Sequence, residues 1–206
     1  YGGGLENSGV VTITRSLLDS NIVTGSGGGV WNLGGYVVMK QTTVRANRAY
    51  EGGGVNSYGN AVELTDVNIT DNVATGSHGG GVYHGGGTFF VTNATISGNR
   101  ANDSSANGGG VYQNSNDNLV LTNVTLANNW AGGFGGGIYH YGRYGILTNV
   151  TITDNHAGLA GAAIYEDAPM TPSSPGVIQL TSSVLAGSAN NCDGPMFQSI
   201  GYNISR

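Results

Sequence analysis

Charged residues, cysteines and long apolar runs are all scarce in this sequence. Only 9% of its 206 residues are charged, and its 7 Lys and Arg residues are scattered, which excludes the clustered basic surface that nucleic acid requires. Cys192 is the single cysteine, so no internal disulfide is expected. No apolar run approaches the roughly 20 residues that cross a bilayer, so we expect no membrane span.

The polar residues that remain are mostly Asn, Ser and Thr. With Lys40 as the sole lysine, the surface is rich in hydroxyl and amide groups, as expected of an extracellular or cell-surface protein. No signal peptide is present, and the chain starts at Tyr1, without Met and inside a glycine-rich motif. We therefore expect a processed or partial product whose export signal has been removed.

Glycine, in contrast, is abundant and periodic. The 38 glycines include a repeated triplet followed by an aliphatic residue, as in Gly79–Gly81 before Val82. Copies start at positions 2, 27, 52, 79, 108, 135 and, in degraded form, 161, so successive starts differ by 25, 25, 27, 29, 27 and 26 residues. A fixed period of this size indicates a solenoid.

A second repeated segment lies downstream of each triplet and is clearest over residues 147–155, Leu-Thr-Asn-Val-Thr-Ile-Thr-Asp-Asn. Its alternation predicts a strand in which Val150 and Ile152 face one side while Thr151 faces the other. β-branched residues at this density favour strand over helix. The strands, turns and glycine corner together fill about 26 residues, which is one rung of a parallel β-helix.

The sequence therefore predicts an all-β fold, namely a single right-handed parallel β-helix, or β-solenoid, of about seven rungs with about 26 residues in each. One domain is expected over residues 1–206, in which residues 168–206 form an irregular terminal rung and tail. The tail after Asn190 has no copy elsewhere in the chain.

An asparagine closes each strand segment, where the chain must turn. Asn tolerates the left-handed backbone conformation, and stacked Asn side chains can hydrogen-bond along a column. We expect a structural asparagine ladder made of Asn21, Asn47, Asn72, Asn99, Asn129 and Asn155. The glycine triplets are expected at a corner that needs positive φ and close approach of the backbone.

These two repeated segments resemble those of right-handed parallel β-helix proteins of the bacterial cell surface, within the pectate-lyase-like superfamily. The resemblance rests on the Gly-Gly-Gly-(Val/Ile)-Tyr and Thr-Asn-Val-Thr-Ile units, and on the terminal segments Asn191-Cys192-Asp193 and Gly201-Tyr202-Asn203. It covers residues 2–204 and implies this fold and a secreted or surface location. It implies no particular activity, because the shared motifs are structural.

An aromatic residue follows the aliphatic residue of most glycine triplets. If the aliphatic side chains face the core, the aromatic ones face outward and stack at intervals of about 4.8 Å. Such a stripe either binds sugar rings or a second protofilament, or stabilises the solenoid by stacking on itself. The stripe consists of Trp31, Tyr83, Tyr112, Tyr139 and Tyr165. The next column, with His84, Gln113, His140 and Glu166, is expected to line the same face.

Six segments satisfy the Asn-x-Ser/Thr acceptor pattern for N-glycosylation. They begin at Asn68, Asn93, Asn102, Asn123, Asn149 and Asn203. Asn93, Asn123 and Asn149 are expected in one outward column, where covalent glycans would form a row. An alternating strand motif also produces this pattern, so both interpretations stay open.

No cluster typical of polysaccharide hydrolases or lyases is evident. Asp66, Asp71 and Asp154 lie in turns rather than in adjacent columns, which disfavours paired carboxylates and Ca²⁺ sites. His84 and His140 lie two rungs apart, about 10 Å, which is too far to share a metal. We predict no catalytic residue, no cofactor and no metal site.

The leading hypothesis is a non-catalytic, extracellular structural or adhesive β-solenoid that self-associates, either end to end into a fibre or laterally. The chain opens in mid-motif, which would leave a rung edge for another strand to extend. The alternative is a carbohydrate-binding or polysaccharide-degrading β-helix protein, for which the aromatic stripe would be the carbohydrate-binding face. No nucleic acid partner is expected.

Overall fold

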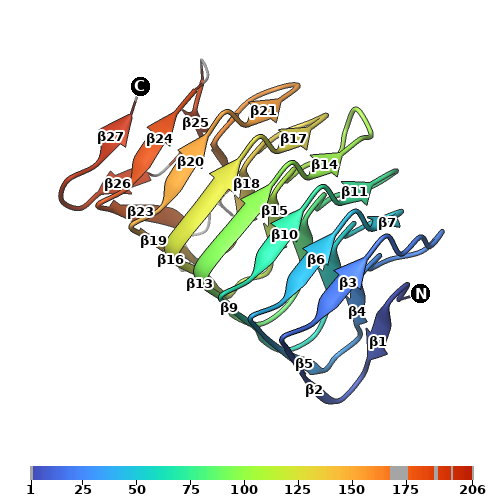
Figure 1. Ribbon diagram of the computed structural model, residues 1–206. Helices are drawn as coiled ribbons and strands as arrows, with labels where there is room; N and C mark the ends of the chain where they lie inside the picture. The colour runs from blue at the N-terminus through green and yellow to red at the C-terminus, as the bar shows by residue number, and fades with distance from the viewer. Residues whose placement is uncertain (1, 168–175, 188–189, 196, 206) are drawn as a thin grey trace.

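The computed structural model describes residues 2–167, 176–187, 190–195 and 197–205. All regular structure among these residues is β-strand, and equivalent strands of successive rungs lie side by side (Figure 1). The chain forms a β-solenoid of about seven turns with about 26 residues per turn, so the predicted all-β solenoid is confirmed. The described part of the chain has no helix of the length and apolarity needed to cross a bilayer.

Sheet A follows the glycine triplets and holds eight parallel strands in sequence order. Its strands are β1 (Leu5–Asn7), β4 (Val30–Asn32), β8 (Val55–Ser57), β12 (Val82–His84), β15 (Val111–Asn114), β18 (Ile138–Tyr141), β22 (Ile164–Glu166) and β25 (Cys192–Asp193). Residues that share a register position form columns along the solenoid, as Val82, Val111 and Ile138 do.

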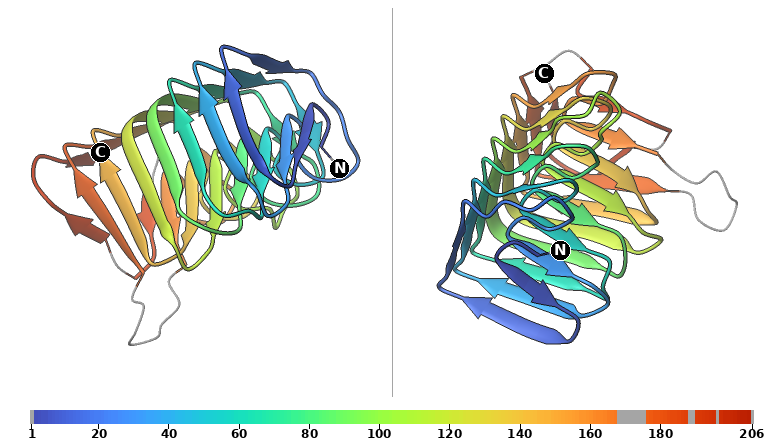
Figure 2. Two further views of the ribbon diagram at one scale, coloured as in Figure 1. Left: turned by 90° about the horizontal axis from the view of Figure 1, so that it is seen from below. Right: turned by 90° about the vertical axis from the view of Figure 1, so that its right-hand side faces the viewer.

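Sheet B has 14 strands and forms two legs, which give each rung a bent outline (Figure 2). The first leg contains β2 (Val10–Thr14), β5 (Tyr36–Lys40), β9 (Val62–Thr65), β19 (Tyr144–Thr148), β23 (Val177–Thr181) and β26 (Phe197–Ser199). The second leg contains β3 (Leu17–Asp19), β6 (Thr43–Arg45), β10 (Asn68–Thr70), β20 (Thr151–Thr153), β24 (Val184–Ala186) and β27 (Ile204–Ser205). Both legs are continuous in β13 (Phe89–Ser97) and β16 (Asn118–Ala127).

Sheet C is a narrow sheet of five two-residue strands that leads toward the next glycine triplet. Its strands are β7 (Arg48–Ala49), β11 (Val73–Ala74), β14 (Arg100–Ala101), β17 (Trp130–Ala131) and β21 (His156–Ala157). Their second residues are alanines, and those at Ala49, Ala74, Ala101 and Ala131 are fully buried. The small side chain lets this narrow side of the rung lie close to the core.

Two columns of left-handed residues turn the chain at the ends of the second leg. The first column consists of Arg15, Gln41, Asp66, Asn93, Asn123, Asn149 and Ser182. The second consists of Ser20, Ala46, Asp71, Gly98, Asn128, Asp154 and Gly187. The prediction that the ladder asparagines adopt the left-handed conformation is therefore wrong by one residue. The residue before each of them adopts it and makes the turn, and the Asn side chain points inward.

The glycine triplets form the corner between sheets C and A. The first glycine has a positive φ, 71° at Gly79. At the next two, an added Cβ would collide with the following rung, 2.4 Å from the carbonyl oxygen of Gly109 at Gly80 and 2.6 Å from that of Gly110 at Gly81. The corner therefore uses both the conformational freedom and the small size of glycine.

Aliphatic side chains from every sheet fill the interior. Val82, Phe89 and Ile96 of a single rung are completely buried. Each such side chain stabilises the fold by about 1.5–3 kcal/mol, but only when neighbouring rungs cover it on both sides. Stability therefore belongs to the stack and not to the single rung.

The C-terminal tail continues the stack. Its strands β25, β26 and β27 pair in parallel with β22, β23 and β24. The tail has no copy elsewhere in the sequence, yet its backbone repeats the earlier strand positions, because parallel pairing requires hydrogen-bonding register rather than identical side chains. Residues 168–175, which include the proline-rich start of the predicted terminal rung, lie outside the described residues.

Candidate functional site: the tyrosine column and its polar neighbours

The outward positions of sheet A carry a stack of rings, here called the tyrosine column and made of Tyr83, Tyr112, Tyr139 and Tyr165. Parallel register places them on consecutive rungs. Their ring centroids are 5.0, 4.8 and 5.7 Å apart, with interplanar angles of 26°, 15° and 15°. The rung spacing of a parallel sheet matches the spacing of stacked rings, so the column is continuous.

Other aromatic side chains cover this column. The rings of Tyr58, His78 and Phe134 pack against it, with centroid distances of 5.0, 4.4 and 4.4 Å. The first three tyrosines of the column are only 6%, 7% and 7% exposed, whereas Trp31 and Tyr165 are half-buried. These first three rings face outward but are covered by other rings, so their geometry is that of the self-stacking alternative and not of an exposed stripe.

The sequence does contain a signal for two of these covering residues. His78 and Phe134 each stand directly before a glycine triplet, as Glu51 does. Backbone bonds such as Gly52 N to the His78 carbonyl align these positions into one column beside the tyrosines. The sequence could therefore have shown that the residue before each triplet lies beside the tyrosine column. Whether its side chain covers the rings depends on the conformation of the loop.

Carboxylates hold tyrosine hydroxyls at both ends of this cluster. Tyr139 donates a hydrogen bond to Asp167, and Tyr58 donates one to Glu51 at 2.5 Å. Glu51 also accepts two further side-chain hydrogen bonds. Burial raises the pKa of Tyr139, and the hydrogen bond to Asp167 raises it further. The hydroxyls therefore stay protonated and act as donors that fix the rings in place.

The residues that follow the tyrosines in the chain point into the solenoid. His84, Gln113, His140 and Glu166 occupy successive rungs of sheet A and are buried. The prediction that they line the outer face is wrong, because successive residues of a strand alternate between its two faces. Together with Asn7, Asn32 and Ser57, they make an interior polar column.

Members of this interior polar column bond to one another. His84 Nδ1 lies 3.1 Å from Gln113 Oε1, so Nδ1 carries the proton and donates. His140 Nδ1 lies 2.6 Å from Glu166 Oε2. Burial lowers the pKa of His84 to about 4 and raises the pKa of Glu166, against the opposing effect of His140. The low polarity of the interior thus favours the neutral form of both groups.

The two buried histidines bond to different partners, with Gln113 on the rung between them. No three His, Cys, Asp or Glu side chains among the described residues come together in a way that would hold a metal ion. Hydrogen bonds between neighbouring rungs hold the interior polar column together, whereas His84 Nε2, His140 Nε2 and Glu166 Oε1 are buried without a hydrogen-bond partner among the described residues.

The asparagine ladder runs inside the bend before sheet C. Each Oδ1 accepts both the backbone N–H and the side-chain amide of the ladder residue one rung earlier, so Asn72 N and Nδ2 each lie 3.0 Å from Asn99 Oδ1. Asn99 Nδ2 also donates to the Ile69 carbonyl at 2.9 Å. The same pattern joins Asn21, Asn47, Asn72, Asn99, Asn129 and Asn155.

Three sequon asparagines form a second, exposed ladder on the left-handed bend between the legs of sheet B. Asn149 Nδ2 donates to Asn123 Oδ1, Asn123 to Asn93, and Asn93 to the carboxylate of Asp66, each at 3.1 Å. Each of the three amide groups uses one N–H in this ladder and has a second. Their exposure leaves that second N–H accessible from solvent.

The other three sequons lie in different surroundings. Asn68 and Asn102 are exposed, on β10 and in the loop after β14. Asn203 is half-buried, and its amide donates to the Leu180 carbonyl at 2.7 Å and to Ser199 Oγ at 2.8 Å. Both N–H groups of Asn203 are therefore engaged inside the fold.

A family profile described as the Chlamydia polymorphic membrane protein repeat matches residues 123–141. The matched segment runs from the bend at Asn123 through the ladder residue Asn129 and the triplet Gly135–Gly137 to Tyr141. It thus spans the parts of a rung that bind neighbouring rungs together. The similarity indicates a bacterial surface protein with a β-helix. No curated protein matches the chain, and no solved structure matches it.

Proposed function

We propose that this chain is a non-catalytic, structural segment of an extracellular bacterial surface protein of the pectate-lyase-like β-helix type. One observation carries the proposal: the tyrosine column, which is the sequence's best candidate for ligand contact, packs against itself and its covering rings. The two carboxylates beside it bond to tyrosine hydroxyls. These groups support the stack and are not free to meet a substrate.

End-to-end stacking into a fibre is the mode of assembly that the first rung supports. Strands β1, β2 and β3 pair with the second rung on one side only among the described residues. Val10, Leu17 and Ile22 on this rung are exposed apolar side chains. The exposed apolar residues of this parallel edge favour pairing with a further rung, whether that rung belongs to the same polypeptide or to a second copy.

Two measurements on the purified chain test this function. Electron microscopy and sedimentation over a concentration series are expected to show particles that lengthen along the solenoid axis, and monomers at every concentration would refute the fibre. A glycan array with lyase and hydrolase assays is expected to be silent. Binding that disappears in folded Tyr112→Ala and Tyr139→Ala variants would instead establish the alternative, a carbohydrate-binding or polysaccharide-cleaving protein.

We propose that the exposed ladder carries covalent glycans. Asn93, Asn123 and Asn149 present accessible amides, whereas both N–H groups of Asn203 are engaged. Intact mass and peptide mapping of native material are expected to find hexosamine at the first three sites and an unmodified Asn203. Unmodified peptides at all three exposed sites would reject glycosylation of this column.

A further inference from the structure

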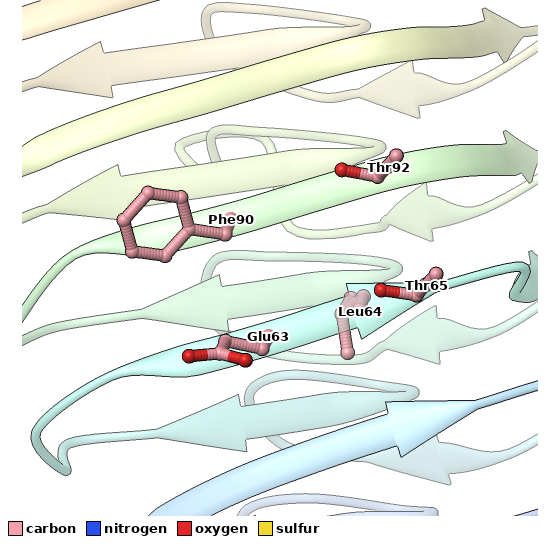
Figure 3. A pocket seen from close by; sticks show the side chains of 5 residues that line it. All are labelled: Glu63, Leu64, Thr65, Phe90 and Thr92. Atoms are coloured by element: carbon pink, nitrogen blue, oxygen red, sulfur yellow. The ribbon is translucent and has the colours of Figure 1, made fainter.

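Outward rings on two sheets of the solenoid differ in their exposure. On the first leg of sheet B, the Phe90 ring stands beside a shallow hollow over β9 and β13 and is 42% exposed (Figure 3). On sheet A, the outward ring of Tyr112 is only 7% exposed. Tyr112 stacks on the tyrosines of the neighbouring rungs, and the His78 ring covers it in addition. The contacts of His78 therefore decide whether this part of the tyrosine column is closed to solvent.

Asn107 holds two of the covering residues in place. It stands directly before the triplet that starts at residue 108, as His78 and Phe134 stand before theirs. Its backbone N–H donates to His78 Nδ1 at 2.9 Å, and its side-chain Oδ1 accepts the backbone N–H of Phe134 at 2.8 Å. One asparagine thus connects the covering residues of three consecutive rungs.

The hydrogen bond between Asn107 and His78 needs a neutral imidazole. Nδ1 accepts in this bond, so the proton of the neutral ring is on Nε2. The same ring lies parallel to the Tyr112 ring, with a centroid distance of 4.4 Å and an interplanar angle of 8°. An imidazolium carries a proton on both nitrogens, so the Asn107 N–H would then face a second donor. Protonation of His78 therefore breaks the bond to Asn107.

Groups from three neighbouring elements act on the His78 ring. The carboxylates of Glu51, before the preceding triplet, and Asp103, in the loop between β14 and β15, favour the imidazolium. Tyr112 on β15 presents a phenol that stays neutral, because burial raises its pKa. Burial of the imidazole outweighs the two carboxylates and lowers the pKa of His78 from its ordinary value of 6.5. The bond to Asn107 is therefore fully formed above pH 6.5 and is lost as the pH falls through the lowered pKa.

We propose that His78 and Asn107 form an acid-sensitive latch over the tyrosine column, closed at neutral pH and released when His78 takes up a proton. Release frees the loop of residues 102–107 from His78 and loosens Phe134 on the next rung. Tyr112 and Tyr165, on which His78 and Phe134 pack, then become accessible. In acid the protein thus presents an aromatic surface that it covers at neutral pH. The latch acts within one chain, so it does not depend on end-to-end stacking.

Hydrogen exchange read by mass spectrometry between pH 7 and pH 5 tests the latch, with each variant compared with the wild type at the same pH. Loop opening that takes up one proton is expected to increase by up to about tenfold per pH unit below pH 6.5. His78→Gln is expected to remove this dependence, because the glutamine oxygen accepts from Asn107 without titrating. His156→Gln changes an exposed histidine on β21 and is the matched control, expected to keep it. Loop exchange with the same pH dependence in the wild type and His78→Gln would overturn the proposal.

An NMR titration of the wild type keeps the test decisive if His78→Gln fails to fold. The Asn107 amide is expected to lose its protection with the same midpoint as the His78 imidazole, while the Val111 amide in β15, bonded to the Gly137 carbonyl, stays protected. A His78 ring that titrates while the Asn107 amide remains protected would refute the latch.

Hydroxyl-radical footprinting measures whether release uncovers the rings. Oxidation of the Tyr112 side chain is expected to rise in parallel with loop opening as the pH falls, and to stay constant in His78→Gln. Tyr50 is already 53% exposed and is the reference, expected to react equally at both pH values. Constant oxidation of Tyr112 in a wild type whose loop has opened would contradict the claim that the latch covers the column.

Discussion

At the scale of single residues, the buried asparagine ladder shows how one side chain connects three consecutive rungs by hydrogen bonds. Asn99 accepts two bonds from Asn72 and donates to Asn129 and to the Ile69 carbonyl. Its side chain is fully buried, so none of these groups has water as a substitute. Unsatisfied buried donors cost about 1–3 kcal/mol each, which makes every ladder position sensitive to truncation.

Asn99→Ala is therefore expected to lower the free energy of unfolding by at least about 3 kcal/mol, because it leaves two Asn72 donors without an acceptor. Urea unfolding followed by circular dichroism measures the change. The exposed Asn102→Ala is the control and is expected to change the free energy by less than about 0.5 kcal/mol. Equal effects of the two substitutions would mean that the ladder adds nothing to stability.

The exposed and buried ladders run in opposite directions. Buried amides donate toward the C-terminal rungs, as Asn72 does to Asn99, whereas the exposed amides donate toward the N-terminal rungs. The exposed ladder ends on Asp66, a carboxylate that accepts and has no proton to pass on. Asp66 is thus the final acceptor of the exposed ladder, and Asn149 is its first donor.

A second prediction at this scale concerns the pH dependence contributed by His84. Its pKa in the folded protein is about 4, below the ordinary value of 6.5. Neutral His84 therefore contributes its full stability above pH 6.5, and this contribution disappears as the pH falls from 6.5 to about 4. The loss amounts to about 3 kcal/mol at 1.36 kcal/mol per pH unit.

Urea unfolding between pH 7 and pH 4 measures this loss, and His84→Gln is expected to flatten the curve, since Gln113 shows that an amide fits the column. Exposed His156→Gln is the control and should keep the wild-type curve. Glu166 acts in the opposite direction, because its raised pKa means that its charge costs stability as the pH rises. An unchanged curve in His84→Gln would show that the ring does not titrate as proposed.

At the scale of the repeated element, the glycine corner sets how closely rungs approach. Gly80 faces the carbonyl of Gly109, which would lie 2.4 Å from an added Cβ, and the contact is with backbone that cannot swing away. In the last triplet Ala162 stands at the equivalent position, where the facing residue Asn190 has a positive φ of 60°. The requirement for glycine thus depends on the backbone of the next rung.

Gly80→Ala is expected to lower the free energy of unfolding by about 3 kcal/mol, because the corner must separate to admit the methyl group. Gly9→Ala is the matched control, since no atom lies within 4 Å of its added Cβ and its φ is not positive. It is expected to change stability by less than about 1 kcal/mol. Thermal unfolding of both variants decides the point, and a neutral Gly80→Ala would refute the close-contact role of the triplet.

At the scale of the whole molecule, stability is expected to vary along the axis. Among the described residues, rungs that contain β12, β15 and β18 have a neighbour on each side, whereas β1, β2 and β3 have one. In a stack held by nearest-neighbour contacts, the outer rung opens first. Hydrogen exchange read by mass spectrometry is expected to protect β12–β18 amides most and first-rung amides least. Equal protection of amides in all rungs of the monomer would contradict the expected gradient of stability along the axis.

Much of the architecture was predictable from the sequence because the repeats encode it directly. The triplet period set the rung length, and the alternation around Val150 and Ile152 set which residues are buried. The same alternation, extended by one residue beyond Tyr83, places His84 inside the solenoid. The prediction that His84 lines the outer face was wrong because it grouped residues by polarity and not by their position in the strand. The pairing of the tail was not predictable, since its side chains match no earlier rung.

The sequence by itself determined the repeat period, the parallel stack and the columns of asparagine and tyrosine, because the same residue types recur at the same positions of successive rungs. It also determined the low content of charged residues. The tertiary structure alone decided that Tyr58, His78 and Phe134 cover the tyrosine column and that Asp167 anchors Tyr139. It also decided that Phe90 and Ile146 are exposed on the first leg of sheet B. Exposure depends on the loops and edges that surround a column, and those contacts join residues from different rungs that no local pattern relates.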